Sequence, residues 1–419
     1  MKRNLVIPAF SAVTFALCIG ATSCQKPIKK DVVEPLQEQP TLPDQTFDYE
    51  KKHGVNSDLA TLGRVLFYDK NLSGNNAVSC GSCHKQENAF ADNVRFSRGF
   101  DGRELKRNSP SIQGIRGFGS KLQFTFQNGS NTQVQTETKP TANNQVPVLL
   151  FWDGRQSSAM NMVLNPVLNH NEMNMPDFAT LESKLTSVNY YSELFKKAYG
   201  DGNITRDRIA FAIQSFMACL NTDNTGNTSV MPFTNGAGPS AINNPTANLT
   251  PLEKEGHNLF HVKYNCAKCH DPSNTGGYNG GSVPSNNVSQ NVFFNNGTPT
   301  PVFFNIGLDA QVNDRGLAAV TGNPKDAGLF KIPTLKNISV TAPYMHDGRY
   351  ATLNDVVDHY SQNIQNTENL SPFLRNLDGT PRKMNVLPNE KIALVAFLKT
   401  LKDDDFLTSP MYSDPFKKN

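Results

Sequence analysis

Two five-residue stretches decide how this chain is understood: Cys80-Gly81-Ser82-Cys83-His84 and Cys266-Ala267-Lys268-Cys269-His270. Both have the pattern C-x-x-C-H, which is the attachment signature of a c-type haem. Two cysteine thiols form thioethers with one porphyrin, and the adjacent histidine becomes the proximal ligand of the iron. A lone C-x-x-C could be a redox disulfide or half of a zinc site, but neither explains an adjacent histidine that occurs twice, and no further C-x-x-C is present to complete an all-cysteine zinc site. The sequence therefore predicts two covalently bound haem c groups.

The start of the chain has the features of an export signal. Lys2 and Arg3 precede an apolar run over residues 5–19, which is too short for a convincing membrane span, and small residues follow. Cys24 comes next and resembles the lipidated cysteine of bacterial lipoproteins; an ordinary signal peptide cut nearby is the alternative. We predict a signal peptide over 1–23 and an anchor cysteine with a flexible tether over 24–47. The protein would then be periplasmic, with the membrane reached only through the lipid at Cys24.

Charge and cysteine usage narrow the class of protein. The chain has 419 residues, enough for two or three domains, and a formal net charge of +3, which gives no reason to expect nucleic-acid binding. Four of the seven cysteines belong to the haem motifs, Cys18 lies in the signal and Cys24 is the proposed anchor. Cys219 lies in an apolar helical pattern and is expected in the core. No cysteine pair remains for a disulfide.

Periodic apolar residues and capping residues predict helices around both motifs. Leu59, Leu62, Val65 and Leu66 recur at helical spacing before the first motif. Thr205 is expected to cap a helix that carries residues 209–220, and Thr250 with Glu253 forms a helix start before the second motif. A last helix begins near residue 389. Residues 115–150 form a polar segment that is long for a connector.

The expected architecture is mainly α, with two cytochrome-c-like haem domains and long irregular loops. The predicted divisions are an N-terminal haem domain over 48–222, an Asn- and Gly-rich linker over 223–248, a C-terminal haem domain over 249–404 and a tail over 405–419.

Several further motifs, in this order along residues 58–402, resemble the bacterial di-haem cytochrome c peroxidases and their MauG-like relatives. Besides the two haem motifs, the markers are Leu62–Asp69, Arg107–Pro110, Phe151–Arg155, Glu172-Met173 and Thr341–Gly348. The resemblance implies that hydrogen peroxide is reduced at the N-terminal haem. It also implies that the C-terminal haem accepts electrons from an external donor, a small redox protein or a quinol-linked donor. A homodimer is compatible with the same reading.

The resemblance also assigns roles to residues. His84 and His270 would be the proximal iron ligands. Glu172 matches the distal glutamate, whose carboxylate takes a proton from bound peroxide and returns it to the leaving oxygen. Trp152 matches a tryptophan that lies between the haems and relays electrons. Asn108, with the backbone carbonyls of Thr341 and Pro343, matches a calcium site whose oxygen ligands suit Ca2+.

The sequence departs from the typical peroxidase at three positions. Typical members carry a capping histidine in the loop after the first haem, but here that loop is residues 96–100 and the next histidine is His170. The first iron is therefore expected to be open. Tyr360 stands where the typical peroxidase has a methionine ligand to the second iron, as in MauG-like proteins. Met345, His346, His359 and Met384 are the rival ligands. Met162 replaces a glutamine near the peroxide pocket.

Three functions compete on these grounds. The leading hypothesis is a peroxidase that reduces hydrogen peroxide. The alternative enzyme is MauG-like and uses peroxide to oxidise a protein or an organic substrate, which the missing cap and Tyr360 both favour. The third hypothesis is a di-haem electron-transfer cytochrome, which would have no need of Glu172 or of an open first iron.

Overall fold

The part of the chain that the structure describes comprises most of the two predicted haem domains. The computed structural model describes residues 47–114, 150–220, 249–270, 292–295, 298–301 and 303–416. These all belong to one compact unit, residues 39–419. The signal, the anchor Cys24, residues 115–149 of the polar segment and the linker over 223–248 lie outside the described residues.

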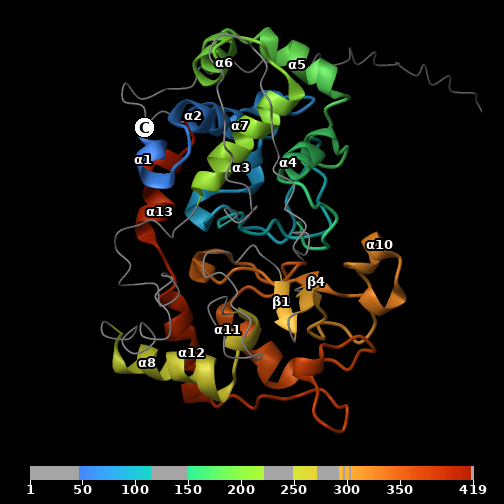
Figure 1. The fold of residues 1–419 in the computed structure, drawn as a ribbon. Coiled ribbons are helices and arrows are strands. Elements are labelled where there is room, and N and C mark those ends of the chain that lie inside the picture. Colours follow the sequence, from blue (N-terminus) through green and yellow to red (C-terminus); the bar gives the residue numbers. More distant parts are fainter. Residues whose placement is uncertain are drawn as a thin grey trace, which may run out of the picture. The chain divides into compact units, whose positions relative to one another are not determined.

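A first hydrophobic core is built by helices from residues 49–220. Its two longest helices are α2 (Ser57–Tyr68), capped by Asn56, and α7 (Arg206–Cys219), capped by Thr205 as predicted. They pack against one another (Figure 1). The other helices of this half are α1 (Tyr49–His53), α3 (Cys80–Cys83), α4 (Ala159–Leu168), α5 (Phe178–Thr186) and α6 (Tyr191–Tyr199). Cys219 is fully buried in this core, which confirms its predicted place.

A second hydrophobic core is built around α8 (Pro251–Asn258) and α12 (Pro388–Lys399), which lie side by side in Figure 1. The predicted capping box is present, because Thr250 Oγ1 accepts from the Glu253 backbone and the Glu253 carboxylate accepts from Thr250. A π-helical turn, Leu259–Lys263, continues α8 toward α9 (Ala267–His270). The helix α11 (Leu353–Asp358) likewise runs into a π-helical turn, His359–Asn363.

Strands are few and short among the described residues. β1 (Val292–Asn295) pairs antiparallel with β2 (Thr298–Pro301), and β3 (Phe303–Phe304) pairs antiparallel with β4 (Phe330–Lys331). The short helix α10 (Ala318–Thr321) lies between β3 and β4 in sequence. The fold is therefore largely helical, as predicted.

The end of the chain returns to the first core. Phe406 and Leu407 of α13 (Asp404–Thr408), together with Tyr412, are buried in the core that residues 49–220 form. The Tyr49 hydroxyl donates to the Met411 carbonyl at 2.5 Å. Figure 1 shows the red α13 beside the blue α1. Residues 405–416 thus complete the N-terminal half instead of extending from the C-terminal one.

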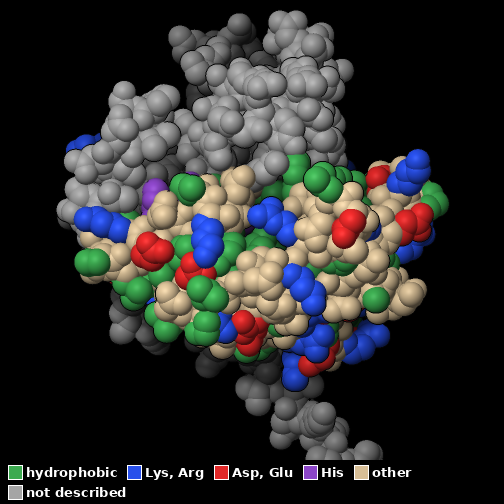
Figure 2. All heavy atoms as spheres, turned by 90° about the horizontal axis from the view of Figure 1, so that it is seen from below, with side chains coloured by type: hydrophobic (Ala, Val, Ile, Leu, Met, Phe, Trp, Pro, Cys, Tyr) green, Lys and Arg blue, Asp and Glu red, His purple; other side chains and the backbone are tan. Residues whose placement is uncertain are grey.

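The surface agrees with the small net charge. On the face drawn in Figure 2, Lys and Arg side chains are interspersed with Asp and Glu across the described residues. Within the described part of the chain, every helix is too short or too polar to cross a bilayer.

Candidate haem sites

The first C-x-x-C-H motif lies on the wall of a large cavity. Cys80 and Cys83 begin and end α3, and both line a cavity of about 1100 Å³ together with His84. Cavities of roughly 300–1000 Å³ hold most small molecules and cofactors, so this one can hold a porphyrin. Ser79 and Ser82 close the start of α3, because the Ser79 backbone donates to Ser82 Oγ at 2.9 Å. The motif is thus held in a rigid turn beside the cavity.

The hydrogen bond of His84 leaves its ring nitrogen Nε2 available to bind a metal. Its Nδ1 lies 2.8 Å from the Phe90 carbonyl, and a carbonyl can only accept, so Nδ1 carries the proton. Nε2 then keeps its lone pair, which is the arrangement usual for a metal-ligating histidine. Burial also lowers the pKa of His84 and favours the neutral ring. The first motif therefore fits a c-type haem in both its thiols and its imidazole.

Glu172 lines the same cavity as the first motif. Burial raises the pKa of its carboxyl group, while the positive charge of Arg155 and a hydrogen bond from Asn169 oppose that rise. Asn169 Nδ2 donates to Glu172 Oε1 at 2.8 Å and so orients the carboxylate. A carboxyl group with a raised pKa releases its proton less readily than an ordinary one, which suits a group that must both accept and return a proton.

The loop that lacks the capping histidine packs directly on the turn that carries Glu172. The Phe100 backbone donates to the Glu172 carbonyl at 2.7 Å. A Cβ on Gly99 would lie 1.8 Å from the Asn171 carbonyl oxygen, so only glycine fits there. Ser97 is fully buried and donates to Asp92 at 2.6 Å. His170 is exposed and does not line the cavity.

The second motif lies on a separate, smaller cavity of about 290 Å³, lined by Cys266, Cys269 and His270. Burial lowers the pKa of His270 to about 4, against a smaller opposite effect of the Pro333 backbone. The imidazole is therefore neutral at physiological pH, as an iron ligand requires. The thiols and the imidazole of this motif also fit a c-type haem.

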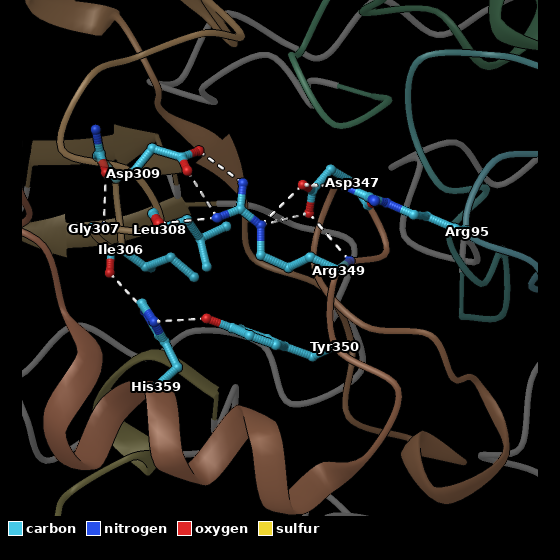
Figure 3. Close-up of polar contacts among 10 residues, drawn as sticks. Arg95, Ile306, Gly307, Leu308, Asp309, Asp347, Arg349, Tyr350 and His359 are labelled. Carbon is cyan, nitrogen blue, oxygen red and sulfur yellow. Dashed lines mark hydrogen bonds and ion pairs between the residues drawn. The ribbon is translucent and has the colours of Figure 1, made fainter.

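The positions of the side chains distinguish the candidate ligands of the second iron. Tyr360 and Met384 both line the second cavity, and Val356 and Val357 lie on the same face of α11 as predicted. Burial raises the pKa of the Tyr360 hydroxyl. His359 does not line the cavity, because its Nε2 lies 2.9 Å from the Ile306 carbonyl (Figure 3).

Two other rivals lie between the cavities. Met345 and His346 line both of them. The His346 ring stacks on Phe330 with a centroid separation of 3.7 Å and an interplanar angle of 13°. This stacking fixes the plane of the His346 ring in the wall that the two cavities share.

Trp152 is part of the wall that the two cavities share. Its Nε1 donates to the Asn108 carbonyl at 2.9 Å, and its own carbonyl accepts from the Lys331 backbone at 2.9 Å. Trp152 is therefore bonded to the first half of the chain through its indole and to the second half through its backbone. This is the place that a relay between two haems would occupy.

Asn108, Thr341 and Pro343 all line the first cavity. Asn108 donates its side-chain nitrogen to the Val94 carbonyl at 2.9 Å, which directs its Oδ1 the other way. Its backbone nitrogen donates to the His346 carbonyl at 2.8 Å. The structure thus places all three residues along the lining of the first cavity.

Sequence reasoning missed the ionic groups around these cavities. Arg107 pairs with Asp153 at 2.6 Å and with Asp314 at 2.7 Å, and so joins the two halves of the chain. Arg349 pairs with Asp309 at 2.7 Å and with Asp347 at 2.9 Å (Figure 3). Asp153 and Asp347 lie within markers that the sequence analysis named, but Asp314 and Asp309 are distant in sequence from their arginines, and no local pattern indicates those pairs.

The comparisons with known proteins agree with this geometry. Residues 57–231 match the family described as di-haem cytochrome c peroxidase. The cytochrome-c peroxidase IdrP2 of Denitromonas iodatirespirans is 30% identical over 365 residues, which cover 85% of this chain and 84% of that protein. The chain belongs to the di-haem cytochrome c peroxidase family. It is therefore an oxidoreductase of the cytochrome c peroxidase type, and the family implies two haem c groups.

MauG proteins are related to this family member as well. The methylamine utilization protein MauG of Paracoccus denitrificans is 29% identical over 381 residues, which cover 84% of this chain and 91% of that protein. A crystal structure of a MauG-like protein associated with microbial copper homeostasis has a TM-score of 0.64 and 27% identity, and covers 91% of this chain and 98% of that one. Peroxidases and MauG proteins thus both resemble the chain over most of its length.

Proposed function

We propose that this family member reduces hydrogen peroxide to water at the first cavity, with electrons that enter at the second. The observation that carries this proposal is the Glu172 carboxyl group, with its raised pKa, on the cavity wall that also holds Cys80, Cys83 and His84. An electron carrier has no use for an acid–base group in that place. Reduction of one peroxide to two waters consumes two electrons and two protons, so a proton carrier at the reacting site is needed.

The haem groups supply the irons that bind peroxide and exchange electrons. Glu172 takes the proton from the peroxide oxygen that binds and returns it to the oxygen that leaves. Asn169 holds Oε1 of Glu172 in place at 2.8 Å, and the charge of Arg155 favours the ionised carboxylate. His84 would hold the first iron through Nε2, and its hydrogen bond to the Phe90 carbonyl fixes the orientation of the ring.

Trp152 is the proposed electron relay, which its place on both cavities supports. Tyr360 is the proposed distal ligand of the second iron; its phenolate would stabilise the ferric state and lower the reduction potential relative to His/Met ligation. Asn108, Thr341 and Pro343 are the proposed calcium ligands, in keeping with their shared cavity wall. These assignments remain proposals for the respective residues.

The proposed setting is the periplasm, with the protein held at the membrane by a lipid on Cys24. The proposed electron donor is a small redox protein or a quinol-linked donor, and a homodimer is the proposed assembly. The haem domains would extend over 48–222 and 249–404, with residues 405–416 packed into the first core.

A MauG-like oxidation of a protein or organic substrate is the second candidate function. Two observations favour it: the loop over residues 96–100 offers no histidine, and Tyr360 faces the second cavity. The identity to MauG of Paracoccus denitrificans, 29%, is close to that of the peroxidase relative. A low potential at a Tyr-ligated iron would suit oxidation better than uptake of electrons from a donor.

Stopped-flow spectroscopy with hydrogen peroxide tests both functions. We expect the fully oxidised protein to react directly, because Gly99 and Ser97 hold a loop without a ligand over the first cavity. The matched measurement uses protein that has first taken up one electron. A reaction that requires this reduction would contradict the open first site. Steady turnover with a reduced donor, rather than oxidation of an added protein, would favour the peroxidase.

A further inference from the structure

Lys331 lies at the centre of the wall between the two haem cavities. It ends β4, which places it opposite Phe303 of β3. Its backbone nitrogen donates to the Trp152 carbonyl at 2.9 Å. The residue lines both cavities. A strand pairing and a backbone hydrogen bond to Trp152 therefore fix Lys331 in the wall that the two cavities share.

The ammonium group of Lys331 has no acidic partner among the described residues. Three aspartates of the cavity walls already form ion pairs with arginines. Asp153 and Asp314 pair with Arg107, and Asp309 pairs with Arg349. Burial alone lowers the pKa of Lys331 to about 8. Lys331 is half-buried in the wall that the cavities share, and a bound haem would shield its ammonium group further from water, where a charge is normally paired.

A haem brings its own carboxylates into the cavity in the form of two propionates. We propose that the Lys331 ammonium pairs with a haem propionate and holds a positive charge between the two irons, which raises the reduction potential of both. A nearby positive charge favours the state that has gained an electron. The effect is stronger inside a protein than in water because the effective dielectric constant is lower. This inference rests on both haem groups being bound in the two cavities.

The test is a spectroelectrochemical titration of both haems in Lys331→Gln, with Lys331→Arg and Lys325→Gln as matched variants. Loss of the charge should lower both potentials, with on the order of a tenfold change in each reduction equilibrium, which is about 59 mV for one electron. Lys331→Arg keeps the charge and should keep the potentials. Lys325 is exposed, so removal of its charge should leave them unchanged.

Unchanged potentials in fully loaded Lys331→Gln would overturn the inference, and so would a shift of one haem alone. An equal shift in Lys331→Arg would also overturn it, since the cause would then be packing. If Lys331→Gln loses haem, Lys331→Met takes its place because it keeps the apolar stem. Haem content is measured as pyridine haemochrome and by mass. A preparation with fewer than two haems per chain contradicts the expected cofactor content and not the role of Lys331. Peroxide reactivity tests the proposed reaction independently.

Discussion

At the scale of single residues, Glu172 combines a place on the wall of the first cavity with a raised pKa. Glu172→Gln keeps the shape of the side chain and removes the base. Because proton transfer by a positioned side chain contributes about 10²–10⁴-fold, we expect peroxide turnover to fall within that range. Burial raises the pKa of Glu172, so activity of the unaltered protein should decline as the pH falls through a value above the ordinary carboxyl range. The variant should lack this acid limb.

Glu104→Gln is the control for this experiment. Glu104 lies at the edge of the same cavity but is largely exposed, and its carboxylate is 3.7 Å from Arg98. Its replacement should change neither the turnover nor the pH profile. Equal losses in both variants, or no loss in Glu172→Gln with intact haem spectra, would assign the proton transfer to another group or to water.

Tyr360 and Met384 are the two side chains among the proposed ligands that face only the second cavity. If Tyr360 is the distal ligand, Tyr360→Phe leaves the second iron open, changes its spin state and raises its potential, because an anionic ligand is lost. Met384→Leu should leave the electron paramagnetic resonance and absorption spectra of this haem unchanged. The opposite result, with a change only in Met384→Leu, would make methionine the ligand.

The site was predictable from the sequence where chemistry depends on short motifs. Residues within a motif, such as Cys80, Cys83 and His84, identify their own function by spacing. The resemblance indicated Tyr360 as a ligand of the second haem, but the residues alone could not separate Tyr360 from His359, because the two are adjacent in sequence. In the folded chain, the Tyr360 side chain lines the second cavity, whereas the His359 side chain lies against the Ile306 carbonyl.

At the scale of elements, both cores contain the same close helix contact. In the first, a Cβ on Gly63 of α2 would lie 1.8 Å from the Ala212 carbonyl oxygen and 2.9 Å from Cβ of Phe216, both on α7. In the second, a Cβ on Gly256 of α8 would lie 1.9 Å from the Ala393 carbonyl oxygen and 2.7 Å from Cβ of Phe397, both on α12. The helix that precedes each haem motif thus packs through glycine against an Ala-x-x-x-Phe face.

Gly63→Ala and Gly256→Ala should each destabilise the protein. Overpacking of a well-packed contact is unfavourable by about 1–3 kcal/mol, whereas alanine in place of glycine within an exposed helix is favourable by about 1 kcal/mol. The backbone carbonyls of Ala212 and Ala393 cannot move aside as a flexible side chain can. Thermal unfolding of the holoprotein measures the effect.

Lys254→Ala supplies the comparison within α8, since this side chain is exposed and the substitution also ends in alanine. It should leave the unfolding temperature nearly unchanged. A Gly256→Ala variant as stable as Lys254→Ala would mean that the two helices can separate, and that the repeated contact does not determine the fold.

Helices were the most predictable elements, because their signals are local. Thr205, Thr250 and Glu253 act as caps where the sequence indicated them. The apolar spacing and the capping residues carried no signal for the π-helical turns after α8 and α11.

At the scale of the whole molecule, the two halves depend on one another through long-range contacts. Phe406 and Tyr412 fill the first core, and Arg107 joins Asp153 to Asp314. A sequence pattern could not indicate that residues 405–416 pack into the first core. Their contact residues in that core are distant in sequence, as the hydrogen bond between Tyr49 and Met411 shows, which joins residues more than three hundred positions apart. Truncation of the C-terminal half would therefore also open the first core, and an experiment on one haem alone needs the full-length chain.

The double variant Cys266→Ala/Cys269→Ala removes one attachment site and keeps every residue of the first core. The expected product has a single covalent haem, with a mass lower than that of the unaltered protein by one haem. Because Glu172, His84 and the cavity around them are intact, the oxidised variant should still react with one equivalent of hydrogen peroxide. It should not sustain turnover, since electrons from the donor enter at the missing haem. The complementary Cys80→Ala/Cys83→Ala variant should accept electrons and fail to react with peroxide. If the first variant turns over continuously with an external donor, electrons reach the first haem directly and the proposed division of labour between the two cavities is wrong.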